Sequence, residues 1–253
     1  MPDRPNPDLP PPGGGPGDGA RMKAILVLAG AVAFAVAPFV VPEFSGFEAG
    51  QFPVPQDRPP VQPAGYAFGI WGLIYVWLLA HAGYGLFARA EATDWDASRP
   101  ALIVSLAVGA AWLSVARVSP LWATVLIWVM LAGALLALLR MPARDRWLAQ
   151  APVAIYAGWL TAASWVSVGL ALAGFGLTGP LLAALIAVPL AVAMAVVVQR
   201  MRPQAPEYGL TVIWALVAVV VANATSGSAV VAVAGVAGII VMGLVLRPSL
   251  QPG

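Results

Sequence analysis

Eight apolar segments, each long enough to cross a bilayer, constrain this chain more than any other feature of its sequence. A spanning helix needs roughly 20 apolar residues, and it satisfies its own backbone hydrogen bonds where no water is available. The sequence therefore predicts an all-α polytopic transmembrane bundle of about eight helices. A seven-helix chain with a re-entrant break is the alternative, because only the short polar stretch 223–228 separates the last two segments. The segments lie near 22–42, 64–87, 100–117, 120–140, 150–174, 180–199, 208–224 and 228–247.

The composition points to the same class of protein. Of the 253 residues, 60% are hydrophobic and only 9% are charged, whereas soluble domains carry about 25% charged residues. We therefore expect the lipid bilayer as a partner and, because the basic residues lie in the loops, no nucleic acid. The chain has no cysteine and one histidine, which excludes disulfides and leaves no set of side chains for a metal site.

The basic residues predict the orientation of the helices. With eight crossings and the N-terminus in the cytoplasm, eleven of the 13 lysine and arginine residues lie on the cytoplasmic side. This is the positive-inside pattern, so we expect a protein of the bacterial inner (plasma) membrane with both termini cytoplasmic. Residues 1–20 are rich in proline and glycine and are predicted to be a disordered tail.

Polar residues within the apolar segments are few, and they limit the chemistry. No aspartate or glutamate lies well inside a segment, which argues against a carboxylate-coupled pump or symporter. We identify no catalytic residue, and we expect a binding protein rather than an enzyme. His81 could bind a ligand or haem, but we favour a histidine bonded to a neighbouring backbone carbonyl. Asn223 is expected to bond a neighbouring helix or to cap its own.

Aromatic residues crowd into the second segment and divide between two faces of its helix. At about 100° per residue, Phe68, Trp71 and Tyr75 share one face, and Tyr66 lies on the opposite one with Trp77 and Tyr84. Only one face can line a single pocket. Three further tryptophans lie toward the interior of their segments, where an interfacial belt explains them less well. If their indoles face the interior of the bundle, they would form a flat-walled cavity suited to a planar apolar ligand, which is the alternative to a belt: Trp112, Trp159 and Trp165.

The aromatic pattern resembles the tryptophan-rich sensory protein (TspO/MBR) family, which includes the mitochondrial translocator protein. The second helix of that family carries a proline five residues before a Phe, and a Trp and a Tyr after it. Here these are Pro63, Phe68, Trp71 and Tyr75. Two weaker matches follow in order, in the third and fifth segments: Trp112, and Tyr156 with Trp159.

The resemblance implies a five-helix bundle over residues 21–175, with residues 176–253 supplying about three additional helices. It implies a hydrophobic, planar, porphyrin or haem-like ligand, a homodimer, and a role as sensor or carrier; no cofactor is certain. A small-solute transporter is the alternative, and an enzyme acting on porphyrin or lipid is a further rival. Carried over by position, the expected ligand-binding residues are Phe68, Trp71, Tyr75, Trp112, Tyr156 and Trp159.

Two departures from the family pattern bear on the expected pocket. Gly109 stands where the family has an asparagine. The long loop near 43–63 lacks the Trp-Tyr and Lys-Pro-x-Trp elements that help to form the family's lid. The proposed cavity would therefore need a different cover.

Overall fold

The chain folds into an all-α bundle with eight helices long and apolar enough to cross a membrane. The computed structural model describes residues 16–41 and 46–250, and within them the chain forms no β-strand. The short helices are η1 (Ala49–Gln51), η2 (Gly65–Gly69) and α3 (Thr93–Asp96). The long helices are α1 (Pro16–Val40), α2 (Ile70–Phe87), α4 (Arg99–Val118), α5 (Pro120–Arg140), α6 (Gln150–Gly174), α7 (Pro180–Met201), α8 (Pro206–Ser226) and α9 (Ala229–Leu250).

The first helix begins earlier than the sequence predicts. Residues 16–20, which the sequence assigns to a disordered tail, form the first turn and a half of α1. Asp18 lies in that first turn, where a carboxylate is stabilised by the unpaired backbone N–H groups and the helix dipole. The rest of the predicted tail, residues 1–15, lies outside the described residues.

The last two helices are separate spans joined by a tight turn, so the seven-helix alternative is wrong. The side chain of Asn223 holds this turn: Oδ1 accepts a hydrogen bond from the backbone N–H of Ser228 at 2.9 Å. Its Nδ2 donates to the carbonyl oxygen of Pro60 at 2.8 Å. The side chain of Asn223 therefore joins the end of α8 to the start of α9 and also ties the turn to the long loop before α2.

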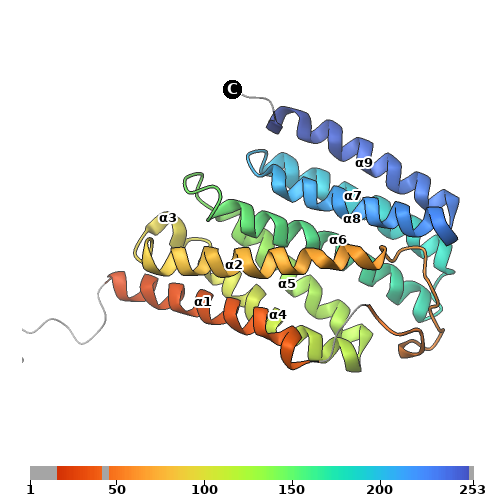
Figure 1. Ribbon diagram of the computed structural model, residues 1–253, viewed down its shortest axis with the longest axis horizontal. Helices are drawn as coiled ribbons and strands as arrows, with labels where there is room; N and C mark the ends of the chain where they lie inside the picture. Colours follow the sequence, from red (N-terminus) through yellow and green to blue (C-terminus); the bar gives the residue numbers. More distant parts are fainter. Residues whose placement is uncertain (1–15, 42–45, 251–253) are drawn as a thin grey trace, which may run out of the picture.

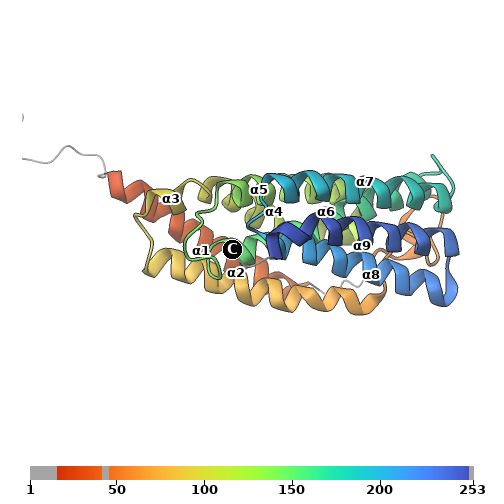
Figure 2. The same cartoon turned by 90° about the horizontal axis from the view of Figure 1, so that it is seen from above.

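The long helices form two groups that share α6. In the first group α1 packs on α2 and α4, α4 packs on α5, and α5 and α2 both reach α6. In the second group α7 and α8 pack on α6, and α9 packs on both of them. Figure 1 shows α6 between the two groups, with α9 at the far edge. Figure 2, seen from above, shows α9 in front, with α7 and α8 on either side of it. In keeping with this central place, α6 is the most buried of the eight spans.

Glycines on α6 allow its neighbours to approach closely. A Cβ on Gly158 would lie 2.5 Å from the backbone oxygen of Tyr208 and 3.0 Å from the Cβ of Thr211, both on α8. No real side chain fits at such a distance. Small residues are the usual means by which helices pack in membranes, since lipid gives them no hydrophobic driving force. Helix α8 is therefore packed against α6 at backbone distance.

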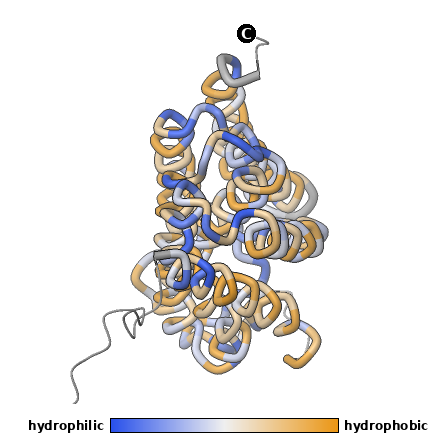
Figure 3. Tube along the Cα trace, turned by 90° about the vertical axis from the view of Figure 1, so that its left-hand side faces the viewer, coloured by the Kyte–Doolittle hydropathy of each residue, from blue (hydrophilic) through white to orange (hydrophobic). Residues whose placement is uncertain are grey.

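Ion pairs gather at one end of the bundle, which we call the charged end. It comprises the start of α1, the α2–α4 connection, and the loops at 141–149 and 202–205. Figure 3 looks at this end and shows hydrophilic loops in front of largely hydrophobic helices. The side chain of Asp145 is the centre of one cluster, because it accepts hydrogen bonds from Arg89 Nε at 2.8 Å, Trp95 Nε1 at 3.3 Å and Tyr84 OH at 3.3 Å.

Arg99 joins the segments of the charged end through hydrogen bonds from a buried position. Its side chain is almost fully buried, and its guanidinium donates hydrogen bonds to four backbone carbonyl oxygens and pairs with Asp96. Five donors in a planar fork suit this use, because each can reach a different carbonyl. The four carbonyls belong to the start of α1 and to the end of α2 and its connection: Ala20, Gly85, Arg89 and Ala90.

Replacement of Gly158 by alanine tests the packing of α8 on α6. We expect the Gly158→Ala protein to lose about 1–3 kcal/mol of stability, because the new methyl group must push two backbones apart. Gly243→Ala on α9 is the matched control, since a Cβ there meets nothing within 4 Å; it should leave stability unchanged or raise it by up to about 1 kcal/mol. Thermal unfolding in detergent, followed by near-ultraviolet circular dichroism, measures both. Equal midpoints for the two variants would contradict the close packing.

The loss of stability at acid pH tests the contribution of the ion pairs at the charged end. Hydrogen bonding from Arg89 lowers the pKa of Asp145 below its ordinary value of 3.8, so the carboxylate stabilises the fold fully at neutral pH. That contribution fades as the pH falls below about 4 and is lost below the lowered pKa.

The variant Asp145→Asn keeps the shape of the side chain and tolerates the positive φ of 55° at this position. We expect it to be less stable than the parent at pH 7, with a smaller further loss between about pH 5 and pH 3. Asp94→Asn, which breaks a more exposed pair with Arg144, should cost no more than about 1 kcal/mol. A pH profile of Asp145→Asn parallel to that of the parent would show that Asp145 is not the group that titrates.

Candidate functional site

A cavity of about 380 Å³ lies inside the first helix group, in the half of the bundle away from the charged end. We call it the main cavity. Its walls come from the last part of α1, the start of α2 with η2, the end of α4, the start of α5 and the middle of α6. None of the described residues that line it is charged: Phe34, Pro38, Val41, Gly65, Phe68, Gly69, Trp71, Tyr75, Trp112, Leu113, Ile127, Met130, Trp159, Leu160 and Ala163.

Aromatic rings make one wall of the main cavity flat. Trp71 and Tyr75 lie one turn apart on α2 and stack with centroids 5.4 Å apart and planes 17° from parallel. Phe34 of α1 meets both rings edge-on, at 5.7 Å and 5.1 Å. These are the offset and edge-to-face geometries that the quadrupoles of aromatic rings favour. The predicted stripe on α2 is thus a continuous aromatic surface held in place by a ring from α1.

The wall formed by α6 is centred on Trp159. Its ring meets Phe68 edge-on at 5.7 Å and Trp71 at 6.1 Å. The indole nitrogen of Trp159 is buried and has no hydrogen-bond partner. A buried donor without a partner costs about 1–3 kcal/mol, so this N–H group is available to an acceptor that enters the cavity.

The main cavity brings together five of the six residues expected from the sequence: Phe68, Trp71, Tyr75, Trp112 and Trp159. Trp112 is fixed by a hydrogen bond from its Nε1 to the carbonyl oxygen of Ala123, at 2.8 Å. This bond joins α4 to α5 and fixes the indole in the wall of the cavity.

Tyr156 lies behind the wall of the main cavity. It is fully buried, and its hydroxyl lies 2.9 Å from Ser105 Oγ. Ser105 donates its own proton to the carbonyl oxygen of Met130, at 2.7 Å, so Tyr156 is the donor to Ser105. Its ring supports Phe34, with centroids 5.6 Å apart. In this arrangement Tyr156 links α6 to α4 and α5 and supports a lining residue.

Phe34 is the main lining residue that the sequence analysis did not identify. It lies in the last third of α1, and its ring packs against Gly109 of α4. A Cβ on Gly109 would lie 2.8 Å from Phe34 Cε2 and 3.1 Å from Met130 Cε. The glycine that replaces the asparagine of the family pattern therefore makes room for the Phe34 ring. The glycine in place of the family's asparagine indicated extra space at position 109, but it did not indicate that the ring of Phe34 fills that space.

The lining of the main cavity includes two glycines that precede α2. Gly65 and Gly69 are exposed, and a Cβ at either position would meet nothing within 4 Å. On the other side of α1, Gln51 in the long loop donates to the carbonyl oxygens of Ala116 and Arg117 at the end of α4. The loop is thus anchored over the end of the bundle by contacts other than the family's lid elements.

The opposite face of α2 packs against protein, as the helical wheel allows. Tyr66 meets Trp214 of α8 edge-on at 5.5 Å, and Trp77 donates from Nε1 to the carbonyl oxygen of Trp147. His81 Nδ1 lies 2.7 Å from the carbonyl oxygen of Leu148, and its ring stacks on Trp95. The interpretation of His81 as a histidine bonded to a backbone carbonyl is confirmed, and it lines neither cavity described here.

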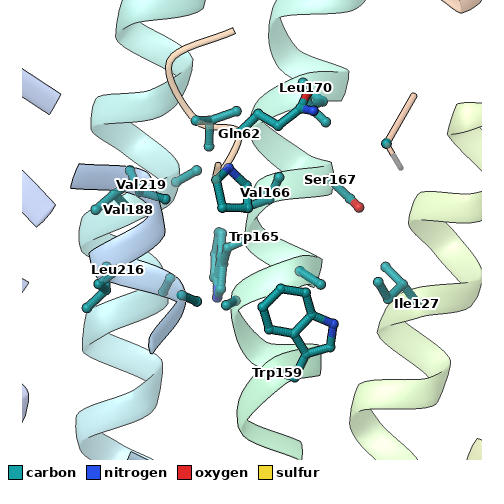
Figure 4. Close-up of a pocket in the computed structure, with 18 of the residues that line it drawn as sticks. Gln62, Ile127, Trp159, Trp165, Val166, Ser167, Leu170, Val188, Leu216 and Val219 are labelled. Atoms are coloured by element: carbon teal, nitrogen blue, oxygen red, sulfur yellow. The ribbon is translucent and has the colours of Figure 1, made fainter. Parts of the chain in front are cut away.

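A second, smaller cavity of about 80 Å³ lies where α6 meets α7 and α8, under the long loop. We call it the small chamber. Figure 4 shows Trp165 and Val166 of α6 among its lining side chains, with Val188 of α7 and Leu216 of α8 on the opposite side. The indole nitrogen of Trp165 is also buried without a partner. Trp165 is held by Trp128, which it meets edge-on at 5.2 Å.

Comparison with known proteins identifies a matching family. The sequence model of a family described as TSPO-like protein matches residues 44–247. The match begins in the long loop and runs through α9, so it spans most of the chain. No curated protein and no solved structure matches this sequence.

Phe34 provides a test of how the main cavity is built. Phe34→Ala removes a ring that contacts three other aromatic side chains, and we expect a loss of about 3–5 kcal/mol of stability. Phe39→Ala is the matched control on the same helix, because Phe39 is 89% exposed and should cost far less in detergent. Unfolding midpoints of the two purified variants decide the matter. Similar losses at both positions would mean that Phe34 does not support the aromatic wall.

Proposed function

The chain belongs to the TSPO-like protein family, and on that premise we propose that it binds a hydrophobic, planar, porphyrin-like ligand in the main cavity. The observation that carries the proposal is the convergence of Phe68, Trp71, Tyr75, Trp112 and Trp159 on one cavity of about 380 Å³. Pockets of about 300–1,000 Å³ with apolar walls and few polar groups are typical of small-molecule sites.

The geometry of the walls favours a flat ligand. The stacked pair Trp71 and Tyr75 offers an extended aromatic face, and the edge-on rings of Phe34 and Trp159 limit the space beside it. The unpaired N–H of Trp159 can donate to one acceptor on the ligand. A ligand with a flat apolar body and a few acceptor atoms therefore suits this cavity.

The proposed mechanism is binding that shifts a population of conformations, and no chemical step is required. Ligand between α1, α2 and α6 would favour the arrangement in which these helices enclose it. The protein would then act as a sensor, if the shift is read by a partner, or as a carrier, if the ligand leaves again. We propose that the ligand enters beside Gly65 and Gly69, which line the cavity and are exposed.

The orientation and assembly of the protein are part of the proposal. The chain is an integral membrane protein, and we propose the bacterial inner membrane with the charged end and both termini in the cytoplasm. Arginines gathered at that end support this orientation. We likewise propose that the protein is a homodimer. We also propose that the chain divides into a five-helix bundle and additional C-terminal helices.

Titration with protoporphyrin tests the proposed site. We expect saturable quenching of tryptophan fluorescence in detergent-purified protein, and an affinity about threefold to tenfold weaker in Trp159→Phe, which loses one hydrogen-bond donor. Trp71→Phe should also weaken binding, because the smaller ring covers less of the ligand.

Trp122→Phe supplies the control for these variants. Trp122 is 61% exposed and lines neither cavity, so its replacement should leave the dissociation constant unchanged. Absence of saturable quenching in the parent protein would overturn the proposed ligand class. Equal affinity in all three variants would move the site away from the main cavity.

A further inference from the structure

We propose that the small chamber is a second subsite, which receives a short branch of the ligand bound in the main cavity and pairs an acceptor on that branch with the indole N–H of Trp165. The inference rests on the proposed function, since it needs a ligand in the main cavity. It adds a feature of that ligand: an apolar branch that carries a carbonyl-type oxygen.

The two cavities share a wall, which is why one ligand can reach both. Five residues line the main cavity and the small chamber alike: Phe68, Trp112, Ile127, Trp159 and Ala163. Figure 4 shows Trp159 beside the small chamber, with Ile127 of α5 across from it. Only side chains separate the two spaces, and a change in the rotamer of a side chain is a fast motion.

The small chamber is open because small residues of the C-terminal helices line it. Ala187 and Ala191 of α7 and Ala215 of α8 line it, together with larger aliphatic side chains. A dry apolar cavity of about 150 Å³ takes up benzene. A chamber of about 80 Å³ therefore has room for a branch of a few atoms and not for a second ring system.

Trp165 supplies the reason to expect an acceptor on the branch. Its indole nitrogen is buried and unpaired, and the edge-on contact with Trp128 restrains the ring. A water molecule in such a place needs two to four polar partners, and the walls of the chamber are mainly apolar. An oxygen carried on an otherwise apolar branch satisfies the N–H group without that requirement.

Three porphyrins with the same ring and the same carboxylates test the inference. Deuteroporphyrin carries hydrogen at the two variable positions, mesoporphyrin carries ethyl groups, and diacetyldeuteroporphyrin carries acetyl groups. We expect mesoporphyrin to bind about tenfold more tightly than deuteroporphyrin, from the burial of one ethyl group. The acetyl compound should gain a further two- to tenfold or so from the hydrogen bond.

Two kinds of variant separate shape from hydrogen bonding. Ala191→Leu fills the chamber and should abolish both preferences while leaving the affinity for deuteroporphyrin unchanged. Ala195→Leu, one turn further along α7 and buried outside the chamber, should keep the full ranking. Trp165→Phe should remove the preference for acetyl over ethyl and retain the preference for ethyl over hydrogen. If either leucine variant loses deuteroporphyrin binding, the corresponding valine variant is read in its place.

The outcomes distinguish the two proposals. Failure of the parent protein to bind deuteroporphyrin saturably would overturn the proposed function itself. Saturable binding of all three porphyrins with equal affinity would overturn only the second subsite. A ranking that survives Ala191→Leu, or an acetyl preference that survives Trp165→Phe, would place the branch elsewhere.

Discussion

The approach of α8 to α6 at Gly158 is the contact on which the arrangement of the bundle depends. Gly158 carries only a hydrogen atom where other residues carry a Cβ. A Cβ at this position would lie 2.5 Å from the backbone oxygen of Tyr208, which is too close for any other residue. Lipid offers no hydrophobic force to press helices together, so such close packing is what joins them. The contact joins α6 to the second helix group, and residues of α7 and α8 line the small chamber.

Neighbouring residues of α6 contact different partners. Tyr156 bonds to Ser105 and so fixes α6 against α4 and α5. Gly158 admits α8, and Trp159 lies in the wall between the main cavity and the small chamber. A change at any of these positions would therefore alter the packing as well as the cavities.

The charged end and the two cavities differ in chemistry for a physical reason. Ion pairs such as that of Arg89 with Asp145 lie at the charged end, where the partners can keep contact with water and headgroups. Within the hydrocarbon an unpaired charge is expensive, and the cavities there are lined by aromatic and aliphatic groups. Among the described residues of these walls, the buried donors without a partner are the indole N–H groups of Trp159 and Trp165.

The sequence alone determined the class of fold and the face of α2 that carries the aromatic stripe. Long apolar runs must form helices in lipid, and a period of 3.6 residues puts Phe68, Trp71 and Tyr75 on one side. Both follow from local rules that need no knowledge of neighbours.

Only the tertiary structure decided which residues meet that stripe. The ring of Phe34 comes from α1 and enters the space that Gly109 leaves open on α4, and the sequence separation of the two positions hides this pairing. Tyr156 matched the family pattern, yet its hydroxyl turns to Ser105 and its ring supports the wall from behind. The small chamber depends on the angle at which α7 and α8 cross α6. Such long-range packing is set by the fit of side chains between helices, which periodicity does not encode.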